Sequence, residues 1–386
     1  MIPYGRQNID DADIQAVINV LRSDFLTQGP AVPAFEQKIA EYCDAKHGVA
    51  VNSATSALHI ACLALDVGPG DVVWTSPISF VASANCARYC GASVDFVDID
   101  PRTYNMSVER LASKLQTAKV QGNLPKVVIP VHLCGQSCEM EEIHILSQEY
   151  GFKIIEDASH AIGGRYKGEL VGNCRYSDIT VFSFHPVKII TTGEGGVALC
   201  NNEALANRMA LLRSHGVTRA PEQMICDPDG AWIYEQIDLG FNYRMTDMQA
   251  ALGASQMDRL DSFIARRHEL AERYDAALKD LPLTLPFQHH NSHSAYHLYV
   301  IGLKQDGVSI DRKTLFDQLR AAGIGVNVHY IPVHTQPYYK GFGFKNGDFL
   351  VAETYYDSAI SLPIYPAMTD EQQDRVISVL RRLVVK

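Results

Sequence analysis

Short runs rich in β-branched residues alternate with segments of helical periodicity from about residue 48 to residue 200. Parallel strands need a long crossover between them, so this alternation predicts an α/β fold with a mostly parallel sheet and helices on both faces. The seven expected strands are Val49–Asn52, Val72–Trp74, Val94–Val97, Val127–Val131, Lys153–Glu156, Thr180–Ser183 and Val197–Leu199. The expected helices between them are Ser56–Leu65, Phe80–Tyr89, Ser107–Gln116 and Glu139–Tyr150.

The chain changes character in its second half. Residues Asn242–Leu278 have the spacing of a long helix, and a proline-containing break follows. Further strands are expected at Tyr296–Gly302 and Gly325–Tyr330, and further helices at Arg312–Ala322 and Asp370–Val384. We therefore expect a large domain over residues 1–255, which includes an N-terminal arm, and a smaller C-terminal α+β domain over residues 256–386.

The composition limits the kinds of partner. Of the 386 residues, 47% are apolar and 20% are charged, which is ordinary for a globular protein. The net charge of −10 disfavours nucleic acid and anionic membranes as partners. The sequence shows no secretory signal and no apolar stretch that could span a membrane, and its nine cysteines are scattered. We expect a cytoplasmic protein with reduced thiols.

Lys188 and Asp157 stand in two short motifs that together indicate pyridoxal phosphate (PLP) chemistry. Lys188 follows an apolar strand and precedes Gly193–Gly196, while Asp157 comes directly after the apolar run 152–155 and Glu156. A lysine amine forms a Schiff base with the PLP aldehyde, and an aspartate carboxylate keeps the pyridine nitrogen protonated. A solvated lysine and a helix N-cap are the alternative interpretations. A carboxylate that ends a buried strand, however, needs a cation or a donor.

Other polar and aromatic residues follow the predicted strands. Ser53 and Thr55 open a helix, where free N–H groups and hydroxyls attract a phosphate; plain N-capping is the alternative. Ser183 is placed to add a further phosphate contact. Phe80 stacks on the pyridine ring or is a core residue. His160 contacts the phenolic oxygen of the cofactor or is a satisfied structural histidine.

Four histidines, at positions 289, 290, 293 and 297, have the density of a metal cluster. Strand periodicity scatters them over different faces, and no carboxylate or cysteine is interleaved with them. We therefore predict no metal site.

Several segments resemble the DegT/DnrJ/EryC1/StrS sugar aminotransferases, PLP enzymes of fold type I, the aspartate aminotransferase fold. The segments are Leu26–Pro30, Asn52–Leu58, Glu156–Ala161, Ser183–Lys188, Gly195–Gly196 and Gly240–Asp247. The resemblance implies that Lys188 is the Schiff-base lysine and that Asp157 holds the pyridine nitrogen. It also implies a phosphate cup of Ser53, Ala54, Thr55 and Ser183, a stacking Phe80, and an Asn242 that reaches the phosphate of a neighbouring subunit's cofactor. A homodimer with shared sites follows from the last of these.

Within the family, His185–Gly196 and His329–His334 resemble the PseC branch, which makes UDP-4-amino-4,6-dideoxy-N-acetyl-β-L-altrosamine for pseudaminic acid. The implied reaction moves an amino group from L-glutamate, through pyridoxamine phosphate, to C4 of UDP-2-acetamido-2,6-dideoxy-β-L-arabino-hex-4-ulose, and 2-oxoglutarate leaves. Substrate contacts are implied for Tyr4, Asp24, Phe25, Leu26, Thr27, His329, Tyr330, Ile331 and Pro332. A dTDP-, GDP- or other UDP-linked 4-keto sugar is the alternative substrate, and a non-catalytic PLP-binding regulator is a more distant alternative.

Overall fold

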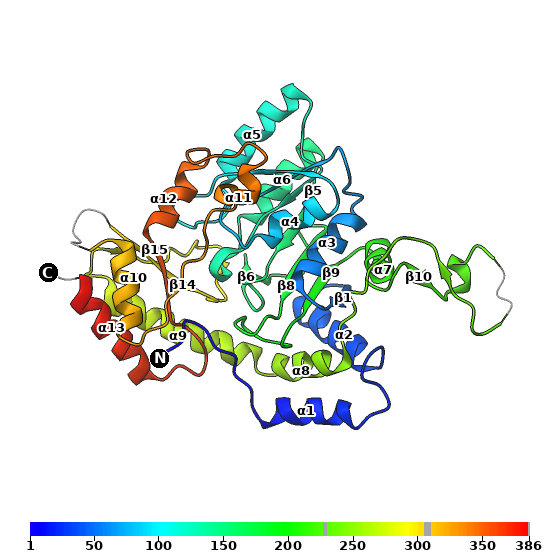
Figure 1. Cartoon of the computed structure of the whole chain (residues 1–386), viewed down its shortest axis with the longest axis horizontal. Coiled ribbons are helices and arrows are strands. Elements are labelled where there is room, and N and C mark those ends of the chain that lie inside the picture. Colours follow the sequence, from blue (N-terminus) through cyan, green and yellow to red (C-terminus); the bar gives the residue numbers. More distant parts are fainter. Residues whose placement is uncertain (227–229, 305–309, 385–386) are drawn as a thin grey trace.

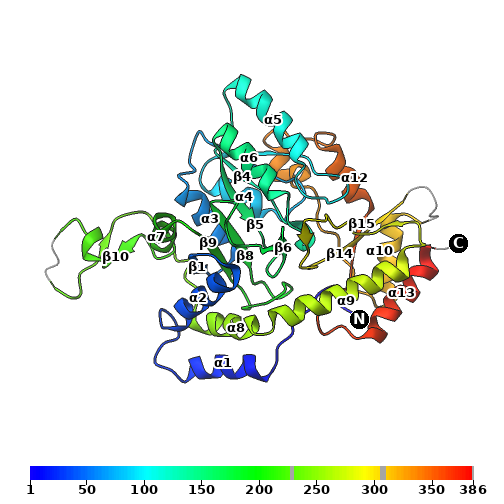
Figure 2. The same cartoon turned by 180° about the vertical axis from the view of Figure 1, so that it is seen from behind.

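The computed structural model describes residues 1–226, 230–304 and 310–384. Its centre is a seven-stranded sheet in the order β1-β9-β8-β5-β4-β2-β3 (Figures 1 and 2). The strands are β1 (His47–Val51), β2 (Val72–Thr75), β3 (Ser93–Phe96), β4 (Val127–Ile129), β5 (Lys153–Asp157), β8 (Ile179–Ser183) and β9 (Gly196–Cys200). β9 runs against both its neighbours, whereas the other neighbouring pairs are parallel. The predicted mostly parallel sheet is therefore confirmed.

Helices cover both faces of this sheet because successive strand residues point to opposite sides. Val127 and Ile129 pack with one set of helices, whereas Val128, between them, packs with another. The first set is α3 (Ala54–Ala64), α4 (Ala82–Tyr89) and α7 (Glu203–Leu212). The opposite face carries α2 (Ala31–Cys43), α5 (Val108–Gln121) and α6 (Met140–Tyr150).

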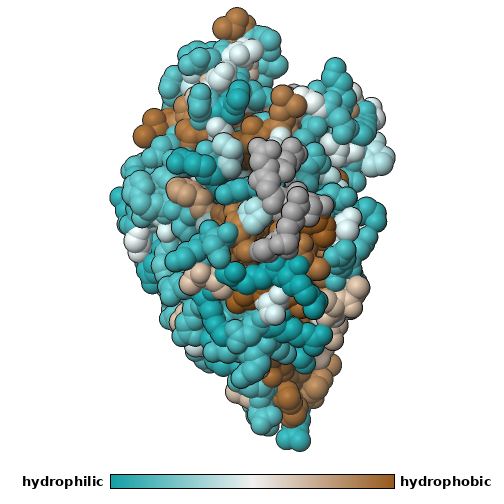
Figure 3. All heavy atoms as spheres, turned by 90° about the vertical axis from the view of Figure 1, so that its left-hand side faces the viewer, coloured by the Kyte–Doolittle hydropathy of each residue, from teal (hydrophilic) through white to brown (hydrophobic). Residues whose placement is uncertain are grey.

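The C-terminal part forms a second hydrophobic core on a smaller sheet. Its strands are β12 (Leu283–Thr284), β14 (Tyr299–Leu303) and β15 (Ala359–Leu362), paired antiparallel. Three helices pack there: α9 (Leu260–Leu278), α10 (Arg312–Ala321) and α13 (Asp370–Val384). α13 buries Val376, Leu380 and Val384 at a spacing of four and turns its charged residues outward. Hydrophilic side chains accordingly predominate on the side of the molecule in Figure 3.

The remaining α-helices and β-strands of the described residues are short. They are α1 (Asp11–Leu21), α8 (Asp247–Met257), α11 (Pro337–Lys340), α12 (Leu350–Ser358), the sheet of β13 (Ser292–His293), β6 (Arg165–Tyr166) and β7 (Glu169–Leu170), and the pair β10 (Val217–Thr218) and β11 (Glu235–Gln236). α1 lies beside α8, and β10 stands in an arm that extends away from the body (Figure 1). Among the described residues, no helix has the length and apolar character needed to cross a membrane.

Two sequence predictions of secondary structure are wrong. The single helix predicted over residues 242–278 is instead α8 and α9: residues 242–246 are not helical, and the chain leaves helical geometry again at Arg259 (φ −111°, ψ 1°). The break lets the Arg259 guanidinium reach Asp13, a fully buried carboxylate that needs a cation. Residues 325–330 form no strand. Asn327 makes one isolated bridge to Ser361, and the Gly325 amide donates a hydrogen bond to the carbonyl of Ile2 near the N-terminus.

Candidate active site

A cavity of about 550 Å³ opens at the carboxyl ends of the parallel strands. Asp157 ends β5 and Ser183 ends β8, while Ser53 lies between β1 and α3 as the N-cap of α3. The loop after β8 brings Lys188 to the same cavity. α4 begins at Ala82, two residues later than predicted, which leaves Phe80 outside the helix on the cavity wall and 60% exposed.

The Asp157 carboxylate is held by three protein donors although it is only 5% exposed. Ser83 Oγ donates to Oδ2 at 2.5 Å, and Ser159 donates to Oδ1 through its hydroxyl at 2.6 Å and its amide at 3.2 Å. Ser79 Oγ lies 2.6 Å from Ser83 Oγ, which fixes the first of these donors. Because a carboxylate oxygen accepts two bonds, Oδ2 retains capacity for a donor in the cavity.

Lys188 supplies an amine that is partly unprotonated near neutral pH. Burial lowers its pKa to about 8, although the negative charge of Asp157 acts in the opposite direction. A buried amine loses the hydration that favours its charged form, so it becomes a nucleophile at a lower pH than a solvated lysine. The alternative interpretation of Lys188 as an ordinary solvated lysine therefore does not fit its environment.

One end of the cavity suits an anion. Ser53 N-caps α3 by accepting the Ser56 amide at 3.1 Å, so the N-capping interpretation holds for this residue. The amides of Ala54 and Thr55, in the first turn, have no partner within their own helix and lie at the positive end of its dipole. Thr55 and Ser183, which both carry hydroxyls, line the cavity together with Ser53 and Ala54.

Gly196 allows two backbones to meet behind this anion-binding end. A Cβ added at Gly196 would lie 2.6 Å from the Ala54 backbone. Any larger residue would therefore displace the N-terminus of α3 from β9.

Three buried histidines, His160, His297 and His329, line the cavity in their neutral form. Burial lowers the pKa of each, and that of His329 to about 3. His160 Nδ1 accepts the Cys134 amide at 3.3 Å, and its Nε2 lies 3.1 Å from the Tyr330 hydroxyl oxygen. Both ring nitrogens of His160 thus have protein partners, which favours the structural alternative over a bond to the cofactor.

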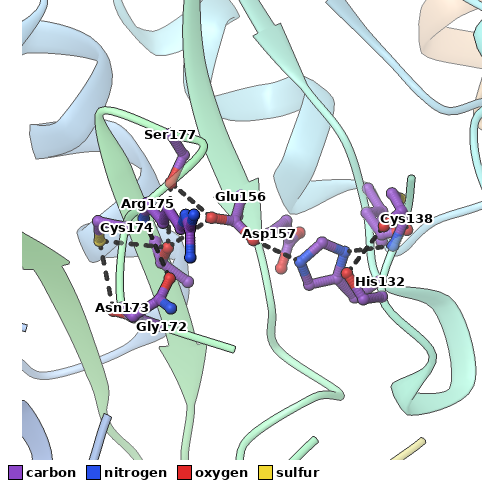
Figure 4. A network of polar contacts seen from close by, with 12 residues as sticks. His132, Cys138, Glu156, Asp157, Gly172, Asn173, Cys174, Arg175 and Ser177 are labelled. Atoms are coloured by element: carbon purple, nitrogen blue, oxygen red, sulfur yellow. Dashed lines mark hydrogen bonds and ion pairs between the residues drawn. The ribbon is translucent and has the colours of Figure 1, made fainter. Parts of the chain in front are cut away.

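A closed polar network lies on the other side of β5 (Figure 4). Glu156 accepts hydrogen bonds from His132 Nε2 at 2.7 Å, from Thr180 Oγ1 at 3.0 Å and from the Ser177 hydroxyl. Burial alone would raise the pKa of Glu156, but these donors lower it. The Cys138 amide lies 3.1 Å from His132 Nδ1, on the other side of the ring from Glu156. Burial would lower the pKa of His132, but its contacts with Cys138 and Glu156 raise it to about 10.

The structure separates the residues predicted to contact the substrate. Tyr4, His329 and Tyr330 line the cavity. The other six do not line the cavity of their own chain. Asp24, Phe25, Leu26 and Thr27 are exposed between α1 and α2, Ile331 is exposed, and Pro332 is buried. Asn242 is likewise exposed and outside the cavity. For these seven residues, contact with substrate or cofactor stays a prediction.

Sequence reasoning missed several residues of the site. Ser79, Ser83 and Ser159 support Asp157, and His185, Glu194, His297 and Asn327 belong to the cavity wall. No signal in the sequence marked these serines, because Ser79 lies before α4 and a single serine on a helix has no distinctive pattern. In the part of the chain that the structure describes, no three His, Cys, Asp or Glu side chains are placed to hold a metal ion.

The donor set fits a phosphorylated pyridine aldehyde. The α3 amides would hold a phosphate, the remaining acceptor capacity of Asp157 would hold a protonated ring nitrogen, and the Lys188 amine would bond an aldehyde. All three belong to one cavity, as a single bound molecule requires.

Comparisons with known proteins agree with this fit. A sequence model of the DegT/DnrJ/EryC1/StrS aminotransferase family matches residues 7–381. The spore coat polysaccharide biosynthesis protein SpsC of Bacillus subtilis is 40% identical over 386 residues, 99% of this chain and 97% of SpsC. The UDP-4-amino-4,6-dideoxy-N-acetyl-β-L-altrosamine transaminase of Campylobacter jejuni is 37% identical, over 99% of this chain and 98% of that protein.

Solved structures show the same likeness. Helicobacter pylori PseC, an aminotransferase of pseudaminic acid biosynthesis, superposes with a TM-score of 0.90 at 30% identity, covering 99% of each chain. The sugar aminotransferase Spr1654 of Streptococcus pneumoniae superposes at 29% identity in its PMP form (TM-score 0.89, 99% of each chain) and in its PLP form (TM-score 0.88, 100% of each chain).

Proposed function

The chain belongs to the DegT/DnrJ/EryC1/StrS family of PLP-dependent sugar aminotransferases, and from that premise we propose that it aminates C4 of a UDP-linked 4-keto-6-deoxy-N-acetylhexose with L-glutamate as donor. The product would be UDP-4-amino-4,6-dideoxy-N-acetyl-β-L-altrosamine, the compound in the name of the 37% identical Campylobacter protein. The observation that carries the proposal is the shared cavity of Asp157 and the low-pKa Lys188.

A second candidate is a different nucleotide-linked 4-keto sugar, including a dTDP- or GDP-linked one. The name of the 40% identical relative refers to a spore coat polysaccharide rather than to pseudaminic acid. Its identity to this chain exceeds that of the altrosamine transaminase by three percentage points, so similarity alone does not separate the two sugars.

When bound, PLP supplies an aldehyde that captures amines and a pyridinium ring that withdraws electrons from the bond beside the captured nitrogen. We propose that Asp157 keeps that ring nitrogen protonated, and that Ser83 and Ser159 keep Asp157 ionised and oriented. Ala54, Thr55 and Ser183 would hold the phosphate, which fixes the position of the reacting atoms.

Lys188 would then act as the proton carrier. Its Nζ would remove the proton from Cα of glutamate, and later deliver a proton to C4 of the sugar. A pKa near 8 suits both directions, because the amine accepts and releases protons close to neutrality. The neutral histidines around it add no positive charge that would oppose protonation of Nζ.

We also propose a homodimer that works in the cytoplasm. Asp24–Thr27 and Asn242 are exposed and lie outside the cavity of their own chain, as expected for residues that serve a neighbouring subunit. The cytoplasmic proposal rests on the nine cysteines, which are all free thiols.

The function is tested by incubating the purified protein with L-glutamate and, in parallel, UDP-, dTDP- and GDP-linked 4-keto-6-deoxy sugars, and identifying products by NMR. The proposal expects a 4-amino sugar from the UDP-linked N-acetylhexose and 2-oxoglutarate in equal amount. Amination of only a dTDP- or GDP-linked sugar would support the second candidate. Lys188→Ala should abolish turnover. Lys153→Ala is the control and should not, because Lys153 stands at the start of β5, pairs with Asp178 and does not line the cavity.

A further inference from the structure

Three cysteine thiols meet where α3 packs against α4 (Figure 1). Cys62 stands near the end of α3, while Cys86 and Cys90 are four residues apart on α4, with Cys90 as its C-cap. The Cys62 thiol has hydrogen-bonding contacts with both of the others, and all three belong to one hydrophobic cluster. Cys62 and Cys86 are fully buried, whereas Cys90 is 8% exposed.

Cys90 differs chemically from an ordinary buried thiol. A hydrogen bond from Cys62 and the neighbouring ring of His59 lower the pKa of Cys90, although its burial acts in the opposite direction. At Cys43 and Cys174, by contrast, burial raises the pKa. Because the thiolate is the nucleophilic form of cysteine, Cys90 is the member of the cluster that reacts first.

Cys62, rather than Cys86, is placed to bond with Cys90. Cys86 and Cys90 are four residues apart on one helix, where Cβ atoms are about 5–6 Å apart, and a disulfide needs a Cβ separation of about 3.5–4.5 Å. Cys62 approaches from the neighbouring helix, with its thiol in contact with that of Cys90. Hydrogen bonds with Cys86 and Cys90 also raise the pKa of Cys62, so it stays a thiol until Cys90 has reacted.

The same two helices carry groups that the cavity presents to the cofactor. α3 begins with the amides of Ala54 and Thr55, which are proposed to hold the phosphate. α4 carries Ser83, which donates to Asp157, and the Cys86 thiol donates to the Ser83 carbonyl at 3.3 Å. A change in how α3 meets α4 therefore reaches both ends of the proposed cofactor site.

We propose that Cys90 and Cys62 form a reversible disulfide, with hydrogen peroxide as the oxidant, and that this bond weakens the hold of the site on PLP. The Cys90 thiolate attacks one peroxide oxygen, the O–O bond breaks, and the departing hydroxide takes the proton that Cys90 had released, which leaves a sulfenic acid. The Cys62 sulfur then attacks the Cys90 sulfur, so that the S–S bond forms, the S–O bond breaks, and the hydroxyl leaves with the Cys62 proton as water. Two thiols are oxidised to one disulfide, and one peroxide is reduced to two waters.

The disulfide alters the packing of the two helices because it shortens the distance between their sulfurs. A disulfide holds its sulfurs about 2.05 Å apart, well inside the separation of about 3.5–4.0 Å that suits unbonded heavy atoms. A displacement of about 1 Å at a catalytic site can slow a reaction about 10²-fold. The effect on PLP rests on the proposed cofactor contacts of α3 and Asp157, and it does not depend on which sugar is aminated.

The disulfide is detected by mass, independently of turnover. The full-length holoprotein is treated with hydrogen peroxide, its remaining thiols are blocked, and it is digested with trypsin without reduction. Trypsin releases Cys90 in peptide 89–102, and Cys62 together with Cys86 in peptide 47–88. The two peptides should be linked in wild type and in Cys86→Ala, and separate in Cys62→Ala and Cys90→Ala. No link in wild type, or a link that persists in Cys62→Ala, would overturn the proposal.

The consequence for the site is measured on PLP itself. Visible absorbance after gel filtration measures the PLP that is retained, and its loss on addition of L-glutamate measures the first half-reaction. Oxidised wild type should retain less PLP and react at least about tenfold more slowly, and dithiothreitol should restore both. Cys62→Ala, which keeps Cys86 and Cys90, is the matched control and should be unaffected by peroxide in both measurements.

Two outcomes of this second measurement would overturn the proposal. One is an equal, reversible loss in Cys62→Ala, and the other is a linked wild type whose PLP retention and rate are unchanged. An untreated protein that binds PLP but reacts with neither glutamate nor sugar would contradict the proposed function alone, because the disulfide and the retention of PLP would still be measured.

Discussion

Glu156 and Asp157 are consecutive residues of β5 that serve two different regions of the molecule. Each is 5% exposed, and each accepts hydrogen bonds from three protein donors. Because strand residues alternate, one carboxylate points into a closed network with His132, and the other into the cavity with Lys188. Burial and hydrogen bonding are the same for both, so only access to the cavity distinguishes the carboxylate proposed to act on a ligand.

This contrast explains how adjacent acids avoid competing for one role. Glu156 accepts hydrogen bonds from Thr180 of β8, from Ser177 in the loop before β8 and from His132 in the segment after β4. It therefore links β5 to two neighbouring parts of the sheet. Among the described residues, the side-chain donors to Asp157 are Ser83 and Ser159, of which Ser159 lines the cavity. Substitutions at the two positions should therefore affect different properties.

The largest expected effect is on stability at Glu156. Glu156→Ala leaves His132 Nε2 and two hydroxyls buried without their acceptor, and we expect the free energy of unfolding to fall by about 3–5 kcal/mol. Chemical denaturation of the variant and wild type measures it. The control is Glu169→Ala, which removes an exposed carboxylate paired with Arg175 and should cost less than about 1 kcal/mol. Equal losses for the two variants would contradict a structural role for Glu156.

At Asp157 the expected effect is on turnover. Asp157→Asn keeps the shape but removes the charge that would hold a ring nitrogen protonated, so we expect kcat to fall about 10²–10³-fold while stability changes little. The matched control, Glu156→Gln, makes the same chemical change one residue away. It should keep most of the turnover and lose stability. An Asp157→Asn variant with near-normal kcat would remove the distinction between the two acids.

Sequence alone was sufficient where a signal lay in contiguous residues. The strands of the large sheet are short apolar runs, and Asp157 and Lys188 are conspicuous because charge beside such runs is costly. The supports of those residues were not predictable, since Ser83 is 74 positions from Asp157 and a serine on a helix has no distinctive pattern. The break at Arg259 likewise depends on Asp13, 246 positions away. The cavity contacts of His160 depend on which backbone amide faces it.

The pH dependence of stability should also differ at the two positions. Donors hold the pKa of folded Glu156 below its ordinary value of 4.5, so its ionised form contributes stability that is complete above about pH 4.5 and is lost as the pH falls through the folded pKa. The stability difference between wild type and Glu156→Gln should therefore shrink as the pH falls from about 5 to about 3.5, a range in which His132, whose pKa is raised to about 10, stays protonated in the folded protein. Denaturation at these two pH values would show it, and a difference that grows over this range would contradict the lowered pKa.

The smallest and most closely matched test removes one hydroxyl from each carboxylate. Ser177→Ala deletes a donor to Glu156, and Ser83→Ala deletes a donor to Asp157. Each change should cost stability of about 1–2 kcal/mol at most, because each deletes one hydrogen bond to a charged group. Only Ser83→Ala should also lower kcat, by a few-fold, since Asp157 then loses the contact that fixes Oδ2 toward the cavity. If both variants lowered kcat equally, the two sides of β5 would be coupled, and the separation of a structural acid from a functional one would fail.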